Sequence, residues 1–540
     1  MGKRSYFNQS KYDWIESFGN LYAFTEYMIT FSVPEFGLGR NQLIDTSVHS
    51  NIVSAYKNYI LGSALLLGGY DDSITQTDIK ELLAFESKLA KLSTKPEDMR
   101  ESKVWYNRMT FKEFNSLTGN RTDWLKVAQF VYKKLNSNIR LSIKDRLIVD
   151  DLAYYREVTR LVVTTPSRVI ANHMGWLIVK KLAVYTTESF RQLEYEFNKV
   201  AKGVKTAVPL TKHCIEALES YLPFAYSRKY VDNHFSDISR QEAKTVVKYV
   251  RRALKRSLKD NDWLDDITKN KSIEKLSAVV EDIGYPDWML DNKQLDKLYN
   301  LLRKPVNITL SWPTYPAKVN AYYDPTQNTI TIPAGILSQP FFRNQVPSYL
   351  NFGSIGVVIG HEYTHGFDDQ EFVLSDIYRY IWIGSEYDPN GNLINWWNGC
   401  MKTIFKEKTK CFINKFSQYV VPEVNMTLNA RNTVGEDISD AGGIKQAFNA
   451  FKSYEKKYGE SQRLPFVNQY SADQLFFISY ANIACGLIRP ETLKDQIEYD
   501  PHSPQKYRVN PHLSKFKPFS DAFKCNLGTK MNSSFSCDLW

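Results

Sequence analysis

Long apolar runs are missing from this sequence of 540 residues. The best run, residues 60–67, is far shorter than the roughly 20 residues that a helix needs to cross a bilayer, so we interpret it as part of a core helix. Residues 1–8 carry charge but no apolar segment, and no signal peptide is recognisable there. Repeats and low-complexity stretches are also missing. We therefore expect a globular chain without a membrane span.

Cysteine is scarce, with six residues, and no two of them are spaced as CxxC. We therefore expect no zinc cluster held by cysteines. An even number of cysteines is compatible with disulfides formed in an oxidising compartment. The net charge of +10 is spread along the chain, and its densest basic cluster is Arg251-Arg252 with Lys255-Arg256. Because this cluster has an amphipathic helical pattern, we interpret it as a solvated helix face and expect no nucleic-acid partner.

The length and composition predict two domains. A chain of 540 residues is too long for a single core, and 43% hydrophobic with 24% charged residues is ordinary for a soluble protein. Apolar residues recur at helical spacing in the first part, as at Leu82, Phe85, Leu89 and Leu92. We expect a mostly helical domain over residues 1–300 and a second domain over residues 301–540.

The motif His361-Glu-Tyr-Thr-His365 is the most informative feature that is present. Residues i and i+4 share one face of a helix, so both imidazoles can reach a single metal ion. Glu362, next to the first histidine, is then placed to act as a general base on water. The alternative is a surface helix with two unrelated histidines; it is less favoured because the chain has only eight histidines.

A third metal ligand is expected in residues 435–443, because zinc needs three protein ligands and an open position. Glu436 and Asp440 are again i and i+4, so Glu436 can bind the metal while Asp440 hydrogen-bonds a ligand histidine. A solvated acidic helix start is the alternative. Gly442-Gly443 argues against it, since each glycine costs about 1 kcal/mol inside a helix. We expect the glycine pair to allow close approach of a neighbouring backbone.

Residues 319–332 predict a β-hairpin, with strands over 319–323 and 329–332 and a turn over 324–328. An exposed strand of this kind can bind an extended peptide by strand addition. Asn320 lies in the first of these strands, where such a peptide would pair. An asparagine that only supports the turn is the alternative.

Further motifs accompany these features. They are, in chain order, Asn320-Ala-Tyr-Tyr323, Pro333-Ala-Gly-Ile-Leu337, Pro340-Phe-Phe342, Val358 to Asp369 around the histidines, Asn395-Trp-Trp397, Gly435 to Gly443, Cys485-Gly486, Arg489-Pro490, Asp500-Pro-His-Ser-Pro504 through Arg508, and Cys537-Asp-Leu-Trp540. Together they resemble the neprilysin and endothelin-converting-enzyme family of zinc metallopeptidases. The resemblance covers residues from about 33 to 540 and is strong only after about residue 315.

The resemblance implies a mainly α fold with a small β component, in two lobes, with a thermolysin-like zinc catalytic domain over residues 301–540. It implies one Zn²⁺ per chain, held by His361, His365 and Glu436. It implies an endopeptidase that cleaves short peptides on the amino side of hydrophobic residues, outside the cell or at its surface. The oligomeric state is left open.

The same resemblance assigns roles to single residues. The catalytic residues that it implies are Glu362 as general base, His502 as donor to the oxyanion and Asp440 as support of a ligand. The residues that it assigns to substrate binding are Asn320, Ala321, Ile336, Phe341, Val358 and Arg508. If His502 is considered without the surrounding motif, a structural role is the alternative. The resemblance also implies a disulfide between Cys411 and Cys537.

The chain departs from the family pattern in several places. Residues 371–383 look inserted, Ala484 replaces a large aromatic residue, and Cys400 matches no family cysteine. The family's N-terminal region, which the resemblance implies would pair with Cys214, Cys485 and Cys525, is not in this chain. These departures motivate an alternative hypothesis, an inactive or poorly folded relative that acts, if at all, by binding peptides or partners.

Overall fold

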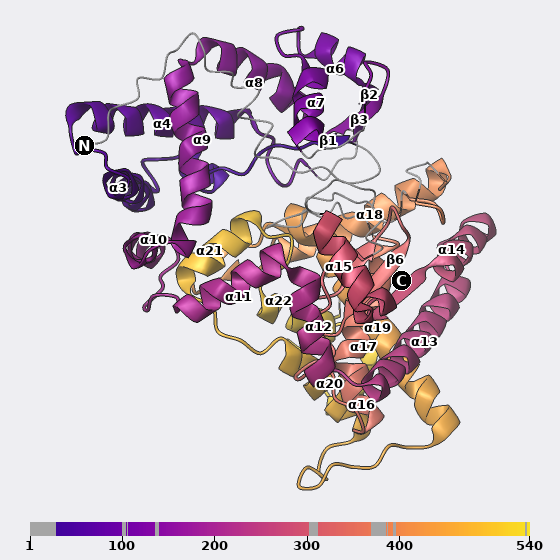
Figure 1. The fold of residues 1–540 in the computed structure, drawn as a ribbon. Coiled ribbons are helices and arrows are strands. Elements are labelled where there is room, and N and C mark those ends of the chain that lie inside the picture. The colour runs from indigo at the N-terminus through magenta and orange to yellow at the C-terminus, as the bar shows by residue number, and fades with distance from the viewer. Residues whose placement is uncertain are drawn as a thin grey trace. The chain divides into compact units, whose positions relative to one another are not determined.

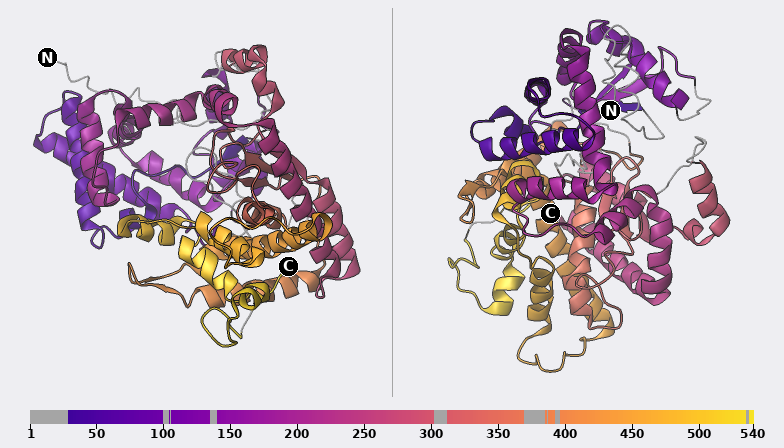
Figure 2. Two further views of the ribbon diagram at one scale, coloured as in Figure 1. Left: turned by 90° about the horizontal axis from the view of Figure 1, so that it is seen from below. Right: turned by 60° about the vertical axis from the view of Figure 1, so that its left-hand side comes forward.

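The computed structural model describes residues 29–99, 104, 106–134, 140–301, 312–368, 385, 387–391, 396–534 and 537–540. They form two compact units. Unit 1 contains the described residues up to Leu218 and a short piece that begins at Asp296, and unit 2 contains Glu219–Leu295 and the described residues from 312 onward. Helices dominate both units (Figure 1, Figure 2). The mainly α fold with a small β component is therefore confirmed.

Unit 1 combines a three-stranded sheet, in the order β1-β3-β2, with a set of helices. The strands are β1 (Ile29–Phe31), β2 (Asn107–Thr110) and β3 (Arg146–Val149), and the helices are α2 (Arg40–Ile44), α3 (Ser50–Leu66), α4 (Ser73–Leu92), α6 (Phe111–Leu117), α7 (Trp124–Lys134), α8 (Leu152–Thr164), α9 (Ser167–Leu182), η1 (Ala183–Tyr185) and α10 (Glu188–Ala201). Aromatic rings fill its core, and Phe31 lies 5.4 Å from Trp124 between ring centroids. α11 (Leu210–Tyr221) and α15 (Asn292–Leu301) each span a boundary between the units.

Unit 2 carries the predicted metal motif and a second three-stranded sheet, in the order β4-β6-β5. Its strands are β4 (Val280–Gly284), β5 (Tyr322–Asp324), β6 (Thr329–Pro333), β7 (Val420–Val421) and β8 (Met426–Thr427). Its helices are α12 (Pro223–His234), α13 (Asp237–Asp260), α14 (Asp266–Ala278), η2 (Asp287–Leu290), α16 (Ser348–Gly353), α17 (Ile355–His365), α18 (Gly399–Phe416), α19 (Ala430–Tyr458), α20 (Ala472–Ile483), α21 (Pro490–Tyr499), α22 (Gln505–Leu513) and α23 (Lys517–Phe523).

The predicted hairpin is present, with a shorter first strand. β5 pairs antiparallel with β6, and Tyr322 lies opposite Thr331. The turn between them is held by Asp324, whose carboxylate accepts hydrogen bonds from the backbone of Thr326 and Gln327 at 2.9 and 3.2 Å. Strand β4 pairs parallel with the other side of β6, so β5 is an edge strand among the described residues. Residues 319–321, predicted as strand, precede β5 without pairing to β6.

Two glycine contacts explain how α17 and α19 pack side by side at the centre of unit 2 (Figure 1). A Cβ added to Gly443 would lie 2.8 Å from the carbonyl oxygen of Val357 and 2.9 Å from the backbone nitrogen of His361. A Cβ on Gly442 would lie 2.4 Å from the hydroxyl of Thr364. The expectation that the glycine pair allows close approach of a neighbouring backbone is confirmed.

The compact units divide elsewhere than at residue 300. Helices α12 to α14 and strand β4, all before residue 300, belong to unit 2. The physical reason is that β4 pairs with β6 and that α13 packs against α17 and α19. The division at residue 300 was drawn from the change in sequence pattern, which reports local structure and not these long-range contacts. The functional division into residues 1–300 and residues 301–540 stays a prediction.

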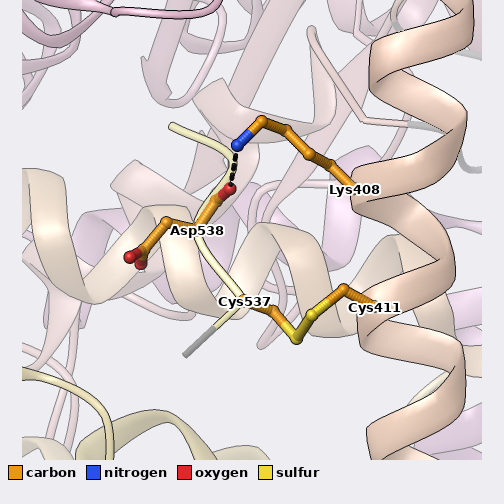
Figure 3. The surroundings of a disulfide bond; sticks show 4 residues. All are labelled: Lys408, Cys411, Cys537 and Asp538. Atoms are coloured by element: carbon orange, nitrogen blue, oxygen red, sulfur yellow. Dashed lines mark hydrogen bonds between the residues drawn. A yellow bond between two sulfur atoms is a disulfide. The ribbon is translucent and has the colours of Figure 1, made fainter. Parts of the chain in front are cut away.

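A disulfide joins Cys411 of α18 to Cys537 near the end of the chain (Figure 3). Lys408, one turn earlier on α18, donates a hydrogen bond to the carbonyl oxygen of Asp538 at 3.0 Å. The bridge that the resemblance implied is therefore present. Cys214, Cys400, Cys485 and Cys525 are not bridged. Among the described residues, no helix combines the length and apolar character that crossing a membrane requires.

Candidate metal centre

Helix α17 places both histidines of the motif in the interior of unit 2. Ser354 precedes the helix and donates its hydroxyl to the carbonyl of Phe341 at 2.6 Å. The backbone nitrogen of Ile355 donates to the same carbonyl at 3.0 Å, which fixes where the helix begins. The helix is buried along nearly its whole length, as its apolar sequence predicts. The Nε2 atoms of His361 and His365 lie 2.8 Å apart, so the two imidazoles converge on one point.

Helix α19 brings Glu436 to that same point. Its Oε2 lies 3.1 Å from Nε2 of His361, and its Oε1 lies 3.6 Å from Nε2 of His365. One ligand atom from each of the three residues falls within 4.8 Å of the others, a geometry that can hold a metal ion. The predicted ligand set is thus brought together from two helices, of which α17 ends at His365 and α19 begins at Ala430.

The carboxylate of Glu436 fits a cation better than it fits a packed core. Its side chain is completely buried, and neither oxygen accepts a hydrogen bond of good geometry from the described residues. A buried carboxylate without such bonds is costly unless it is paired with charge or binds a metal. Two imidazole nitrogens and one carboxylate are also the donor set that zinc accepts in catalytic sites. The residues present therefore fit a zinc ion.

Both histidines are oriented by carboxylates behind them. Nδ1 of His361 lies 2.8 Å from Oδ1 of Asp440. Nδ1 of His365 lies 2.5 Å from Oδ2 of Asp368 and 3.1 Å from the hydroxyl of Ser439. Such contacts fix the tautomer that turns Nε2 toward a metal. The sequence reasoning identified Asp440 and missed Asp368 and Ser439. An acidic residue three positions after the second histidine was the signal for Asp368.

His502 reaches the same centre from the segment between α21 and α22. Its Nε2 lies 3.3 Å from Oε2 of Glu436, and its Nδ1 lies 2.7 Å from the carboxylate of Asp500. Asp500 also accepts a hydrogen bond from the backbone nitrogen of His502 at 2.8 Å. Ser503 donates to the carboxylate of Asp437 at 2.9 Å, which ties this segment to α19. The role of Asp500 in orienting the histidine was not foreseen.

Arg508, on α22, makes a bidentate ion pair with Asp440. Its Nε and Nη2 atoms donate to the two carboxylate oxygens at 2.8 and 2.7 Å. Its Nη2 also lies 3.6 Å from Oε2 of Glu436. The hydroxyl of Tyr480 donates to the Arg508 carbonyl at 2.7 Å. The guanidinium therefore lies beside the metal centre and neutralises part of its negative charge.

The other predicted substrate residues lie in two places. Asn320 is exposed just before β5, and its side-chain oxygen accepts a hydrogen bond from the backbone nitrogen of Ala321 at 3.0 Å. Ile336, Phe341 and Val358 belong to the apolar core of unit 2, where Ile336 is buried and the other two are half-buried against it. Their roles in binding a substrate stay predictions.

The charges of the centre favour a cation. Burial lowers the pKa of His361, but the carboxylates of Asp440 and Glu436 outweigh burial and raise it to about 10. Burial raises the pKa of Glu436, but the nearby histidines, His502 first, outweigh burial and hold it well below its usual range. Burial also raises the pKa of Glu362, with the same histidines acting against it. The site is therefore built to hold positive charge, as protons or as a metal ion.

Comparisons with known proteins agree with this geometry. Two models of peptidase family M13 match residues 17–286 and residues 320–539. The two matches lie on either side of residue 300. Neprilysin-1 of Trittame loki is 35% identical over 552 residues, which cover 96% of this chain and 74% of that protein. Endothelin-converting enzyme 1 of Mus musculus is 32% identical over 538 residues, which cover 94% of this chain and 67% of that protein.

Solved structures with the same fold include two bacterial proteins. One is the zinc metalloprotease Zmp1 of Mycobacterium tuberculosis in complex with an inhibitor, with a TM-score of 0.78 and 25% identity over 93% of this chain and 76% of that one. The other is PepO of Lactobacillus rhamnosis, with a TM-score of 0.77 and 23% identity over 94% of this chain and 78% of that one. The second likeness concerns the fold alone.

Proposed function

The chain belongs to peptidase family M13, and we propose that it is an active zinc endopeptidase that cleaves short peptides on the amino side of hydrophobic residues. One observation carries the proposal. The ligand atoms of His361, His365 and Glu436 converge within 4.8 Å, next to the buried carboxylate of Glu362 on the same helix. An inactive relative would not be expected to retain this whole set.

The three converging residues would hold one zinc ion per chain. When bound, zinc supplies Lewis acidity that acidifies water and polarises a carbonyl group. Asp440 and Asp368 would keep the two histidines in the tautomer that binds metal. The completely buried Glu436 would supply the third ligand atom and part of the charge that balances the ion.

Glu362 would act as the general base. It is buried directly beside the ligand His361, so water is excluded from most of its surface. Its carboxylate would take the proton from the attacking water and pass it to the leaving amine. His502, held by Asp500 at 2.7 Å, would donate a hydrogen bond to the oxyanion that develops in the transition state.

Substrate placement would use the edge of the β4-β6-β5 sheet and Arg508. We propose that Asn320 and Ala321, just before edge strand β5, hydrogen-bond the backbone of an extended peptide. Nε and Nη2 of Arg508 are engaged by Asp440, so its Nη1 would donate to a peptide carbonyl. Asp440 would then position the arginine as well as the ligand His361.

Specificity for a hydrophobic residue after the scissile bond would come from Ile336, Phe341 and Val358. All three belong to the apolar core of unit 2. Val358 is on α17, and the carbonyl of Phe341 accepts the hydrogen bond that begins this helix. Ala484, half-buried against the same core, would leave room for a large side chain. We also propose an extracellular or cell-surface location, because the Cys411–Cys537 disulfide suits an oxidising compartment.

Hydrolysis of a quenched peptide with Phe or Leu after the scissile bond tests the proposal. We expect cleavage that a chelator stops and that added zinc restores. Glu362→Gln should abolish cleavage while the protein still binds zinc, because the general base is lost and the ligands are not. Glu407→Gln, an exposed residue of α18, is the matched control and should leave cleavage unchanged. A folded, zinc-loaded protein that cleaves nothing would favour the peptide-binding relative.

A matched pair of peptides tests the specificity. Replacing the Phe or Leu by Asp at that position should reduce kcat/KM at least tenfold, since an apolar pocket has no partner for a carboxylate. Equal cleavage of both peptides would contradict the assignment of Ile336, Phe341 and Val358.

A further inference from the structure

Helix α13 presents an unbroken row of basic side chains to solvent. Its apolar side packs into the core of unit 2, and the helix runs along one edge of that unit (Figure 1). On the opposite side lies what we call the basic row, whose members are all exposed: Lys244, Lys248, Arg252, Lys255, Arg256 and Lys259. At roughly 1.5 Å per residue, the row is about 22 Å long. Arg251 is turned aside to an ion pair with Glu281 at 2.8 Å.

The charge of the basic row is not compensated within the described part of the chain. None of its side chains forms an ion pair with a residue that the structure describes. The helix has one acidic residue between its two terminal aspartates, Glu242, whose carboxylate accepts hydrogen bonds from the backbone nitrogen of Gln345 at 3.3 and 3.2 Å. Each member of the row is three or four residues from another member, a spacing at which like charges destabilise a helix. A helix face that only keeps a protein in solution carries charges of both signs, so this row calls for an anionic partner.

The end of α19 enlarges this positive surface. Nη2 of Arg256 donates a hydrogen bond to Oγ of Ser453, on α19, at 2.6 Å, which places the last turns of that helix beside the row. Lys456 and Lys457 follow in the last turn of α19, and both are exposed. The basic row and these two lysines therefore form one positive surface of unit 2.

The composition of this face narrows the choice of an anionic partner. Apart from the row, Gln241 is the only exposed residue over residues 241–259. Over this range no exposed apolar side chain can insert into a bilayer, and no exposed aromatic ring can stack on a nucleic-acid base. A linear polyanion with closely spaced charges matches a row that is one helix wide. The Cys411–Cys537 disulfide suits an oxidising compartment, and outside cells the polyanions of this kind are sulfated polysaccharides.

We propose that the basic row binds a sulfated glycosaminoglycan, whose sulfate and carboxylate groups pair with the lysines and arginines. This contact holds the peptidase at a cell surface or in the matrix around cells. Clusters of basic residues are typical of heparin-binding surfaces. Binding relieves the repulsion within the helix and releases counterions from the polyanion, so it weakens as the salt concentration rises. The inference rests on the extracellular or cell-surface location proposed above and not on catalysis.

The affinity of the full-length chain for heparin, measured by calorimetry at physiological ionic strength, tests the proposal. The combined variant Lys244→Gln, Lys248→Gln and Lys255→Gln removes charges along the row. It should bind heparin at least about tenfold more weakly, and with a smaller dependence on salt. Because glutamine favours helices and the repulsion is reduced, this variant should be at least as stable as the unsubstituted chain. The double variant that retains Lys244 serves if the triple variant does not fold.

The combined variant Lys80→Gln, Lys88→Gln and Lys91→Gln is the matched control. These lysines are exposed on α4 of unit 1, at nearly the same spacing as those of the row variant. The control loses the same net charge but should bind heparin within about twofold of the unsubstituted chain. Hydrolysis of the quenched peptide should be unchanged in both variants, since none of these lysines belongs to the metal centre.

The remaining outcomes decide between the basic row and its alternatives. Equal losses of heparin affinity in the row variant and the control would show a response to net charge alone and would overturn the inference. Equal affinity for heparin and for heparin stripped of its sulfates would also overturn it. Tighter binding to a DNA duplex or to phosphatidylserine vesicles than to heparin would assign the row to a nucleic acid or to a membrane instead. A chain that binds heparin through the row but cleaves no peptide would refute the proposed function alone.

Discussion

At the scale of single residues, His512 predicts how stability depends on pH. It is buried on α22 against the ring of Phe416, and its Nε2 has no hydrogen-bond partner among the described residues. Burial lowers its pKa to about 3 from an ordinary value of 6.5, with the charge of Asp440 acting against burial. Between these values the unfolded chain binds a proton that the folded chain does not. Stability should therefore fall as pH is lowered from about 6.5 to about 3.

His512→Leu removes this titration. Over that window, the difference in unfolding free energy between the unsubstituted chain and the variant should change by up to about 1.4 kcal/mol per pH unit, in favour of the variant at lower pH. Urea unfolding of the metal-free protein in chelator measures it without a contribution from metal loss. A difference that stayed constant with pH would show that His512 does not titrate as inferred.

At Ser503 we expect a substitution to affect catalysis separately from stability. Its buried hydroxyl and that of Thr433 donate to the two oxygens of Asp437, at 2.9 and 2.8 Å. Only Ser503 is next to His502, so Ser503→Ala should lower kcat about tenfold with little change in KM or zinc content. Thr433→Val removes the other donor and should cost similar stability, about 1–3 kcal/mol, with kcat retained. Equal kcat in the two variants would argue against a positioning role for Ser503.

Much of the metal centre was predictable at this scale because its residues follow helical spacing in the sequence. His361 and His365, and Glu436 and Asp440, each follow the i, i+4 rule, and each pair lies on one helix as expected. The contacts of Asp368 were not predicted. Asp368 lies just beyond the helix, where spacing no longer fixes the direction of a side chain.

At the scale of elements, the packing of α17 on α19 predicts the effect of Gly443→Ala. The added Cβ would meet backbone atoms of α17 at 2.8 and 2.9 Å, which cannot move as a side chain can. The helices must separate, so we expect a loss of about 1–3 kcal/mol in unfolding free energy and weaker zinc binding, because Glu436 moves away from the histidines. Guanidinium unfolding and zinc titration measure the two effects.

Gly399→Ala provides the control for that substitution. Gly399 begins α18, and a Cβ there would meet nothing within 4 Å. The variant should be neutral or slightly more stable, since alanine restricts the unfolded chain. If both alanine variants behaved alike, close helix packing would not be the reason for the glycine at position 443.

The elements themselves were predicted unevenly. The hairpin was predicted because Asp324 and Asn328 mark the two ends of a turn between apolar stretches. Its first strand begins at Tyr322 and not at residue 319. The pairing of β4 with β6 was not predicted, because it joins segments about 50 residues apart with no local signal. Residues 371–383, which the sequence suggests are inserted, lie outside the described residues.

At the scale of the whole molecule, the two units have separate cores. The apolar cluster of unit 2 contains the interior residues of α13, α17 and α19, and the two clusters of unit 1 share no residue with it. All three zinc ligands belong to unit 2. A ligand that binds only the folded state stabilises the unit that holds it, by about 4 kcal/mol when its concentration is 1,000 times Kd.

Calorimetry should therefore resolve two transitions, of which only one depends on zinc. Adding chelator should lower the midpoint temperature of the unit 2 transition by several degrees and leave the midpoint of the unit 1 transition unchanged. Glu436→Ala should show the lowered transition with or without zinc, because the site has lost a ligand. A single transition that moves as a whole would mean that the units unfold together. Movement of the unit 1 transition alone would place the bound metal elsewhere than at His361, His365 and Glu436.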